Sequence, residues 1–153
     1  MSRGRGLMRR PSVAFVCERC GRPIYHAADH PAGDVMCPGC GSRHPLRIEQ
    51  GLLQSRQVAH CLRCGRERLY TQKDFNRTIG LGIFAAAALL SVPTWGLSLL
   101  AATLIDVVLY HVLGDVTICY ACNAQHRGFP RNPAHGPFDL HVAEIVDHQP
   151  RPV

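Results

Sequence analysis

One hydrophobic run dominates the pattern of apolar and polar positions along this chain. Residues 79–113 are almost all apolar, and they include one acid, Asp106, and one histidine, His111. A run of this length with so little charge is typical of a membrane segment. The alternative is a buried hairpin in the core of a soluble protein. We favour the membrane segment, because the rest of the chain offers too little apolar surface to cover the run.

The hydrophobic segment carries a turn signal near its middle. Pro93 has no N–H group with which to continue a helix, and Gly96 relaxes the backbone of the turn. As helices, residues 79–92 and 97–113 would be about 21 Å and about 25 Å long, against a hydrocarbon core of about 30 Å. We therefore predict a helical hairpin that enters one leaflet or barely crosses the bilayer.

Outside this segment the apolar runs are short and alternate with polar residues. Four of them, at 13–16, 24–25, 35–36 and 46–48, predict the strands of two short hairpins. Near the C-terminus, Asp139 is placed to cap a short helix over residues 140–146. Between these elements the pattern predicts polar connections.

The cysteines give the chain its chemistry. All eight fall in pairs with two intervening residues, whereas disulfide scaffolds scatter their cysteines. Two thiolates at this spacing can reach one ion at about 2.3 Å, so we predict two structural zinc ions per chain. The ligands, numbered here as four knuckles, are Cys17 and Cys20, Cys37 and Cys40, Cys61 and Cys64, and Cys119 and Cys122.

The residue after each knuckle fits the turn that a zinc knuckle needs. This position often requires a positive φ angle, and it holds Gly21, Gly41 and Gly65 after the first three knuckles. Asn123 follows the fourth, and asparagine tolerates positive φ better than most other residues. The sequence therefore predicts four backbone turns of one kind.

The knuckles can pair in three ways, and the spacing between the first two favours local pairing. In every intramolecular pairing, the fourth knuckle shares zinc with a knuckle that precedes the hydrophobic segment. Both ends of that segment must then lie on one side of the bilayer. Residues 1–78 hold 14 basic and six acidic side chains, a net charge of +8, which places that side in the cytosol together with reduced thiolates.

These inferences predict a small α+β protein with two zinc ribbons, the second interrupted by a helical hairpin in the membrane. Its parts would be a disordered basic tail (1–11), a first ribbon (12–49), a linker (50–60), a second ribbon (61–129) with its hairpin (79–113), and a C-terminal tail (130–153) with a short helix. The predicted location is a membrane, with both termini and the zinc sites in the cytosol.

The second ribbon resembles the LITAF-type domain, in which a hydrophobic insertion separates two knuckles that close one zinc site. The likeness covers about residues 60–123 and includes His60-Cys61-Leu62-Arg63-Cys64 and Ile118-Cys119-Tyr120-Ala121-Cys122. It implies an insertion that anchors the protein on the cytosolic face of a membrane. That family usually has His-x-Cys-Pro-x-Cys at its second knuckle, where this chain has Thr117 and Tyr120. The C-terminal third also resembles small uncharacterised bacterial zinc-ribbon membrane proteins.

Three functions are compatible with this pattern. We favour a non-catalytic, membrane-anchored adaptor that contacts lipid and holds a protein partner at the cytosolic face, because eight thiolates fill two closed sites and leave no open metal position. The alternative is nucleic-acid binding by the first ribbon, with Phe15 and Tyr25 for stacking. Its basic residues would be Arg19, Arg22, Arg43 and Arg47. A thiol redox protein is the third, although the βαβ unit that normally carries a redox Cys-x-x-Cys is not evident.

The histidines near the knuckles are predicted to lie at the surface. His60 adjoins Cys61 and is expected on the surface of the third knuckle rather than as a ligand. His26, His30 and His44 lie in or beside the first ribbon and are expected in surface loops.

Overall fold

The computed structural model describes residues 10–75 and 77–148. Apart from its last two residues, the predicted disordered tail (1–11) lies outside this range. The described chain divides into two compact units, one formed by residues 73–114 and the other by residues 10–72 and 115–148.

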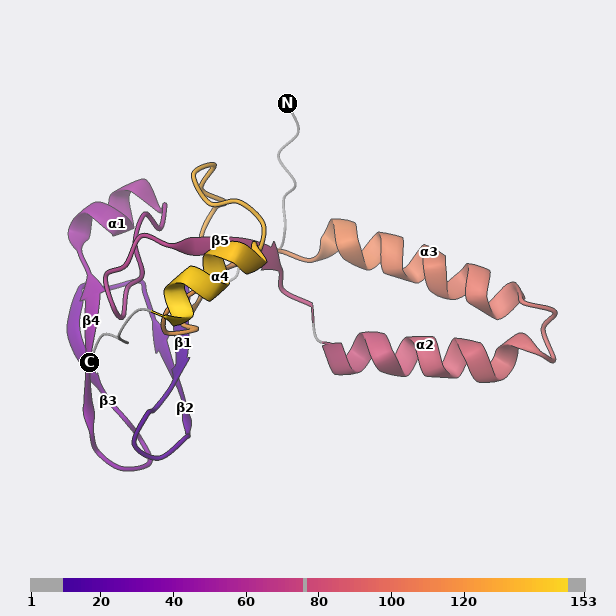
Figure 1. Cartoon of the computed structure of the whole chain (residues 1–153), viewed down its shortest axis with the longest axis horizontal. Coiled ribbons are helices and arrows are strands. Elements are labelled where there is room, and N and C mark those ends of the chain that lie inside the picture. Colours follow the sequence, from indigo (N-terminus) through magenta and orange to yellow (C-terminus); the bar gives the residue numbers. More distant parts are fainter. Residues whose placement is uncertain (1–9, 76, 149–153) are drawn as a thin grey trace. The chain divides into compact units, whose positions relative to one another are not determined.

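A five-stranded sheet forms the centre of the larger unit, in the spatial order β2-β1-β7-β6-β5 (Figure 1). Neighbouring strands are antiparallel in the pairs β1–β2, β1–β7 and β6–β7. The first ribbon therefore shares a sheet with strands from the far end of the chain, which the sequence pattern did not predict. The strands are β1 (Ser12–Val16), β2 (Pro23–Ala27), β5 (Leu69–Lys73), β6 (Asp115–Cys119) and β7 (Gln125–Arg127).

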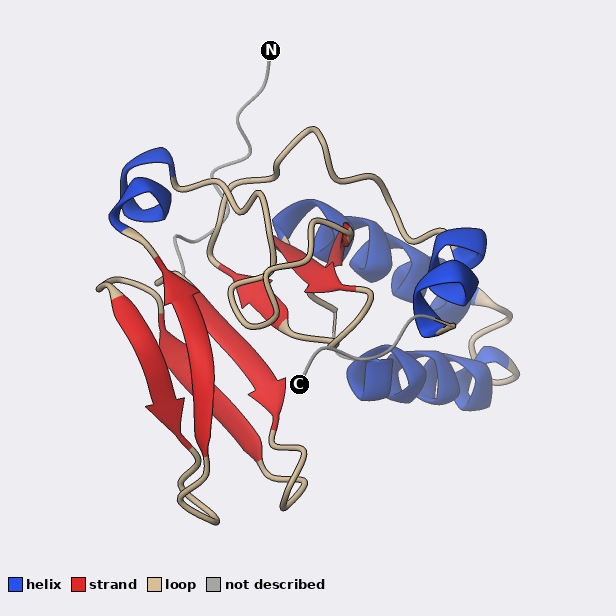
Figure 2. Cartoon of the chain, turned by 60° about the vertical axis from the view of Figure 1, so that its left-hand side comes forward, coloured by secondary structure: helices blue, strands red, loops and turns tan. Residues whose placement is uncertain are grey.

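A separate two-stranded sheet pairs β3 (Ala32–Met36) with β4 (Arg43–Ile48). Along β4, exposed and buried residues alternate, so that His44, Leu46 and Ile48 all point to the core. This period of two is the pattern expected of a half-buried strand. Strands β1 to β4 overlap the four short apolar runs and confirm the predicted hairpins (Figure 2).

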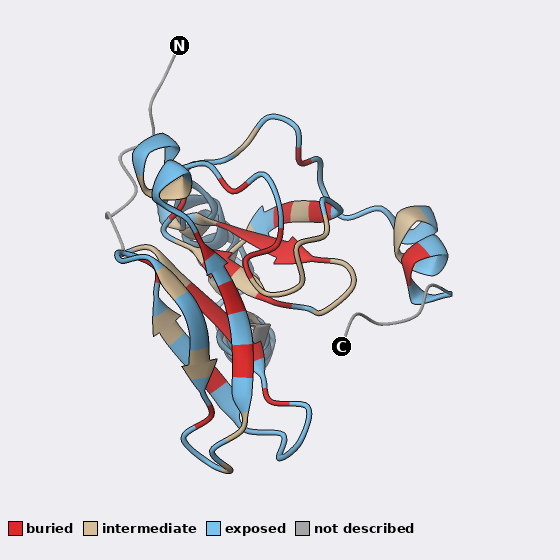
Figure 3. Ribbon diagram, turned by 90° about the vertical axis from the view of Figure 1, so that its left-hand side faces the viewer, coloured by how far each residue is buried: buried red, intermediate tan, exposed pale blue. Residues whose placement is uncertain are grey.

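Buried residues lie on the strands and in the loops of the larger unit (Figure 3). Most of the buried apolar residues form one cluster that includes knuckle cysteines. Its large members come from both ribbons and from the segment between them: Val13, Phe15, Ile24, Leu46, Ile48, Val58, Leu62, Leu69 and Phe129. Each fully buried side chain of this size contributes about 1.5 to 3 kcal/mol. A core with so few large side chains is typical of small domains that depend on metal for stability.

Two short helices complete the larger unit. Helix α1 (Gln50–Ser55) lies within the predicted linker and ends at Arg56, which has a φ angle of 52°. Helix α4 (Leu140–Asp147) confirms the predicted C-terminal helix: the Asp139 side chain accepts hydrogen bonds from the N–H groups of His141 and Val142. This N-cap satisfies two of the free donors at the start of the helix.

The smaller unit is a hairpin of α2 (Arg77–Ser91) and α3 (Leu97–Val112), which run side by side (Figure 1). The chain reverses between them, with φ angles of 53° at Trp95 and 82° at Gly96. Local hydroxyl groups satisfy carbonyl groups near the turn: Thr94 Oγ1 donates to Leu90 O at 2.6 Å. Ser98 Oγ donates to Ala87 O at 2.8 Å and so links the two helices.

The predicted placement of this hairpin in a membrane is wrong. Among the described residues, no helix is both long enough and apolar enough to cross a bilayer. Helices α2 and α3 have 15 and 16 residues, whereas a spanning helix needs about 20. This finding overturns the membrane hairpin of the predicted fold class (79–113). It also overturns the predicted location, a membrane with termini and zinc sites in the cytosol.

Candidate metal centres

The structure brings the eight cysteines together in two groups of four. Within each group the sulfur atoms all lie within 4.8 Å of one another. Zinc site 1 consists of Cys17, Cys20, Cys37 and Cys40, and zinc site 2 consists of Cys61, Cys64, Cys119 and Cys122. This is the local pairing of the knuckles. Four converging thiol groups without a disulfide are the donor set of a structural zinc site, so the two groups fit two zinc ions.

Zinc site 1 is built from two turns of the same design. In the first, Gly21 N–H donates to Cys17 O at 2.8 Å, and in the second, Gly41 N–H donates to Cys37 O at 2.9 Å. The glycines have φ angles of 70° and 71°, which side chains disfavour. Across the site, Cys17 Sγ lies 3.7 Å from Cys40 Sγ, and Cys20 Sγ lies 3.5 Å from Cys37 Sγ. Each turn therefore contributes two of the four sulfur ligands of zinc site 1.

A serine supports the thiolates of zinc site 1. Ser42 Oγ lies 3.0 Å from Cys40 Sγ and 3.4 Å from Cys17 Sγ. Its hydrogen bond lowers the pKa of Cys17 to about 5 and also lowers the pKa of Cys40. His44 Nε2 lies 3.1 Å from the same hydroxyl and can donate to it, which leaves the Ser42 proton for a sulfur atom. Thiolates are the form that zinc binds, so Ser42 favours the metal-bound state.

Zinc site 2 uses the same turn, although 54 residues separate its two knuckles between Cys64 and Cys119. Gly65 N–H donates to Cys61 O at 2.8 Å, and Asn123 N–H donates to Cys119 O at 3.0 Å. The φ angles are 76° at Gly65 and 54° at Asn123. All four residues that follow a knuckle thus have the predicted positive φ.

The sulfur atoms of zinc site 2 are more buried than those of zinc site 1. Two pairs of them are close enough to share a proton. Cys61 Sγ lies 3.4 Å from Cys122 Sγ, and Cys64 Sγ lies 3.6 Å from Cys119 Sγ. Hydrogen bonding with Cys119 raises the pKa of Cys61 and lowers the pKa of Cys64. Protons held between neighbouring sulfur atoms are released when a metal ion takes their place.

The sequence analysis did not predict the buried histidine beside zinc site 2. His126 is 1% exposed and lies on β7. Its Nε2 accepts from Leu62 N–H in the third knuckle at 3.2 Å, and its Nδ1 donates to Thr117 O at 3.1 Å. Burial lowers the pKa of His126 to about 4 and keeps the ring neutral. In the sequence, a histidine between two polar residues gives no sign of this role.

One ion pair connects the two zinc sites. Arg63, inside the third knuckle, donates from a guanidinium nitrogen to Glu18 Oε1, inside the first knuckle, at 2.7 Å. The guanidinium carbon of Arg63 also lies 4.8 Å from the centre of the Phe15 ring. Its side chain is 10% exposed, whereas that of Glu18 is 64% exposed. The two sites are therefore in direct contact through their knuckles.

The four arginines predicted for nucleic-acid binding are exposed, and Arg43 and Arg47 share one face of β4. Tyr25 is 72% exposed. The second predicted stacking ring, Phe15, is 3% exposed and lies beneath Arg63. That part of the hypothesis is wrong, because a buried ring offers no face to a base. The four exposed arginines of this hypothesis are Arg19, Arg22, Arg43 and Arg47.

The histidines divide between surface and core. His60 and His30 are exposed, as predicted, whereas His26 is half-buried on strand β2 and not in a surface loop, so that prediction is wrong. His44 is not in a surface loop, and that prediction is wrong. It is 8% exposed on β4, where its ring meets the ring of Phe15 edge-on at 5.5 Å. The alternation along β4 turns it toward the core.

Comparisons of the chain with protein-family models, curated proteins and solved structures gave no match.

Proposed function

We propose that this chain is a non-catalytic zinc-ribbon scaffold that presents an apolar helical hairpin to a protein partner. The observation that carries the proposal is the exposure of large apolar side chains on both helices of the hairpin and at its tip. Among them are Ile79, Leu81, Phe84, Leu89, Leu97, Leu100 and Leu104, each more than half exposed. A helix that is apolar on its exposed sides requires an apolar environment.

The chemistry of the hairpin favours a protein groove without charge. Between Arg77, the first residue of α2, and Arg127 there is no lysine or arginine, and Asp106 is the one acid on α3, so most of the hairpin carries no charge. Trp95, at the tip, is 98% exposed, and Phe84 is 65% exposed. Large aromatic side chains of this kind act as anchors when a helix binds in a groove. The partner we propose therefore has a deep apolar groove with a pocket for an indole ring.

The base of the hairpin is held by polar contacts. Asp74 N–H donates to Gly114 O at 3.0 Å, and Lys73 Nζ donates to Leu113 O at 3.3 Å. Lys73 Nζ also lies 5.1 Å from the centre of the Tyr110 ring. The ligands of zinc site 2 precede and follow the hairpin in the sequence, so a bound ion ties together the strands that enter and leave it. This arrangement suits a scaffold whose fold depends on zinc.

Two features support a role without catalysis. Four thiolates complete the coordination of each zinc ion and leave no position for water or substrate. Each Cys-x-x-Cys lies in a turn, whereas a redox-active pair normally lies at the start of a helix. Both features favour zinc as a structural element.

Photo-crosslinking tests the proposal. A photoreactive phenylalanine analogue replaces Trp95 in one variant and Tyr25 in a control variant, and both are irradiated in cells. We expect one discrete adduct with a different protein from position 95 and none from position 25. The purified partner should bind the zinc-loaded chain at least about tenfold more weakly after Leu100→Asp, because a desolvated charge is costly in an apolar groove.

Three results would contradict the proposal. They are an adduct only with a second copy of the chain, flotation of the purified chain with lipid vesicles, and unchanged binding after Leu100→Asp. Tyr25→Asp is the matched control, because it places the same charge at an exposed residue of the larger unit.

A further inference from the structure

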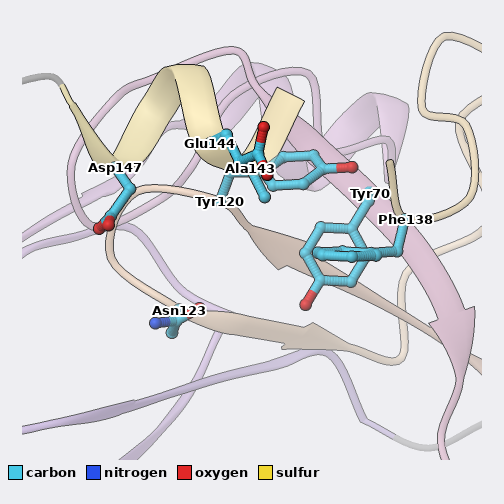
Figure 4. A pocket seen from close by; sticks show the side chains of 7 residues that line it. All are labelled: Tyr70, Tyr120, Asn123, Phe138, Ala143, Glu144 and Asp147. Carbon is cyan, nitrogen blue, oxygen red and sulfur yellow. The ribbon is translucent and has the colours of Figure 1, made fainter. Parts of the chain in front are cut away.

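A pocket on the larger unit lies outside both zinc sites and outside the hairpin. It has a volume of about 290 Å³ and is lined by side chains from β5, from the fourth knuckle, from the loop before α4 and from α4 itself. Figure 4 shows the aromatic rings grouped at one side, with the acidic side chains on α4 and the amide of Asn123 elsewhere around the pocket. Its volume lies near the lower end of ligand pockets, which suits a single side chain or a small molecule.

Three rings form one wall and hold one another in place. The ring centres of Tyr70 and Tyr120 are 4.6 Å apart, those of Tyr70 and Phe138 are 5.1 Å apart, and those of Tyr120 and Phe138 are 5.6 Å apart. The hydroxyl group of Tyr120 accepts from Asp139 N–H at 2.7 Å, which joins the wall to the start of α4. The wall is therefore organised before any ligand arrives, which reduces the cost of binding.

The charged side chains that line the pocket are both acidic. Glu144 and Asp147 line it three residues apart on α4, so they lie on one face of the helix. None of the residues that line the pocket is a lysine or an arginine. Tyr120 and Asn123 flank Cys122 of zinc site 2, where four thiolates around one Zn²⁺ ion leave a net charge of −2. An anion would be repelled here and a cation attracted.

We propose that this pocket binds an organic cation, a guanidinium or alkylammonium group on a short apolar stem. The ring faces attract the cation through their quadrupoles, and the carboxylate of Glu144 supplies the opposite charge. Phe138 is 52% exposed and forms the outer part of the wall. Such a group belongs to the arginine side chain of a peptide or to a free amine, and both have the chemistry that the pocket recognises.

Titration of the zinc-loaded full chain tests this site. The probe is N-acetyl-arginine methylamide, followed by the amide resonances of residues 120–123 and 138–147. Its neutral isostere, N-acetyl-citrulline methylamide, is the matched ligand control. We expect saturable shifts with the arginine probe and none with the citrulline probe. Agmatine, a free guanidinium compound, distinguishes the two sources: equal affinity indicates a free amine, and weaker affinity indicates a peptide side chain.

Two substitutions locate the binding. Glu144→Gln and Phe138→Leu should each weaken the arginine probe about threefold to fivefold, since each removes one exposed electrostatic contact. Glu67→Gln makes the same charge change at an exposed residue that does not line the pocket, and should leave affinity unchanged. Equal binding of the citrulline probe, or unchanged affinity in both variants, would overturn the proposal.

Discussion

Zinc sites 1 and 2 have the same ligands and the same knuckle turn, but they differ in how the rest of the protein supports them. In site 1 the ligands are at most 23 residues apart; Cys17 and Cys37 are buried, but Cys20 is exposed. In site 2 they are up to 61 residues apart; Cys61 and Cys119 are buried, and neither of the other two ligands is exposed. Closing the longer loop costs only about 1 kcal/mol more, because loop entropy grows with the logarithm of length. Separation in the sequence is therefore a minor difference, and burial is the important one.

The two sites also differ in the groups that support their ligands. In site 1 the hydroxyl group of the half-buried Ser42 forms hydrogen bonds with the sulfur atoms of Cys17 and Cys40. In site 2 the buried His126 joins the third knuckle to the strand that leads into the fourth. Ligands of both sites belong to the core, but the supporting side chain is half-buried in site 1 and fully buried in site 2.

Removing one ligand from each site should give very different results. A structural zinc site contributes on the order of 10 kcal/mol to folding, which is comparable to the whole stability of a small domain. We expect Cys119→Ser to abolish the cooperative thermal transition. We expect Cys20→Ser to keep that transition at a lower temperature, because Cys20 is exposed and the serine oxygen or a water molecule can complete the coordination of zinc at site 1. Circular dichroism and metal analysis measure both, and equal loss in the two variants would show that burial does not distinguish the sites.

The buried histidine of site 2 should make stability depend on pH. The pKa of His126 is about 4 in the folded protein, against about 6.5 when unfolded. Between these values the unfolded chain binds a proton that the folded chain does not, so the free energy of unfolding falls as pH falls from about 6.5 to about 4. The expected loss is about 3 kcal/mol.

Urea denaturation across this pH range, with zinc in excess, measures the loss. Release of zinc at low pH adds to the slope in any variant, so His126→Gln serves as the control. It should show a shallower dependence on pH than the wild type. An equal slope in the two proteins would mean that His126 does not contribute.

The residues with positive φ in the knuckle turns allow a test with a smaller expected change in stability. Gly41 in site 1 has a φ angle of 71°, and the corresponding Asn123 in site 2 has 54°. Gly41→Asn should cost less than about 1 kcal/mol, whereas Gly41→Val should cost about 1 to 2 kcal/mol, since a branched side chain strains a left-handed backbone. No other atom lies within 4 Å of a Cβ built at Gly41, so the difference would report backbone strain. Thermal denaturation of both variants measures it, and equal costs would argue against a required positive φ.

The ion pair between the sites should have the smallest effect. A double-mutant cycle of Glu18→Gln and Arg63→Gln should give a coupling energy below about 1 kcal/mol, since Glu18 is largely exposed. Zinc binding at one site should then raise affinity at the other by at most about fivefold. Competition with a chromophoric chelator, read for each site in turn, measures this factor. A coupling energy well above about 1 kcal/mol, or a change in zinc affinity much larger than about fivefold, would contradict this prediction.

Much of the metal chemistry was predictable because it depends on local spacing. Two thiolates separated by two residues, followed by a glycine or an asparagine, define a knuckle before any tertiary contact forms. The strands beside the knuckles and the cap at Asp139 were predictable for the same reason. The roles of Phe15 and His44 were not, since a ring beside a knuckle can point outward or inward until the opposite side of the core is known.

For the hairpin, the apolar composition of the sequence led to a wrong prediction of a membrane segment. Residues 79–113 are apolar enough to suggest a membrane, but the helices on either side of the turn at Pro93 have 15 and 16 residues, and neither can cross a bilayer. Hydropathy responds to composition, whereas spanning depends on the length of unbroken helix, and the turn divides that length.

The eight zinc ligands, their turns and the reversal of the hydrophobic segment can be predicted from the sequence, because each depends on residues within a few positions of one another. The pairing of β7 with β1, the burial of His126 beside zinc site 2 and the contact of Arg63 with the first knuckle became evident only in the folded chain. These contacts connect residues far apart in the chain, and their free energy arises only when the strands that carry them have come together in one sheet.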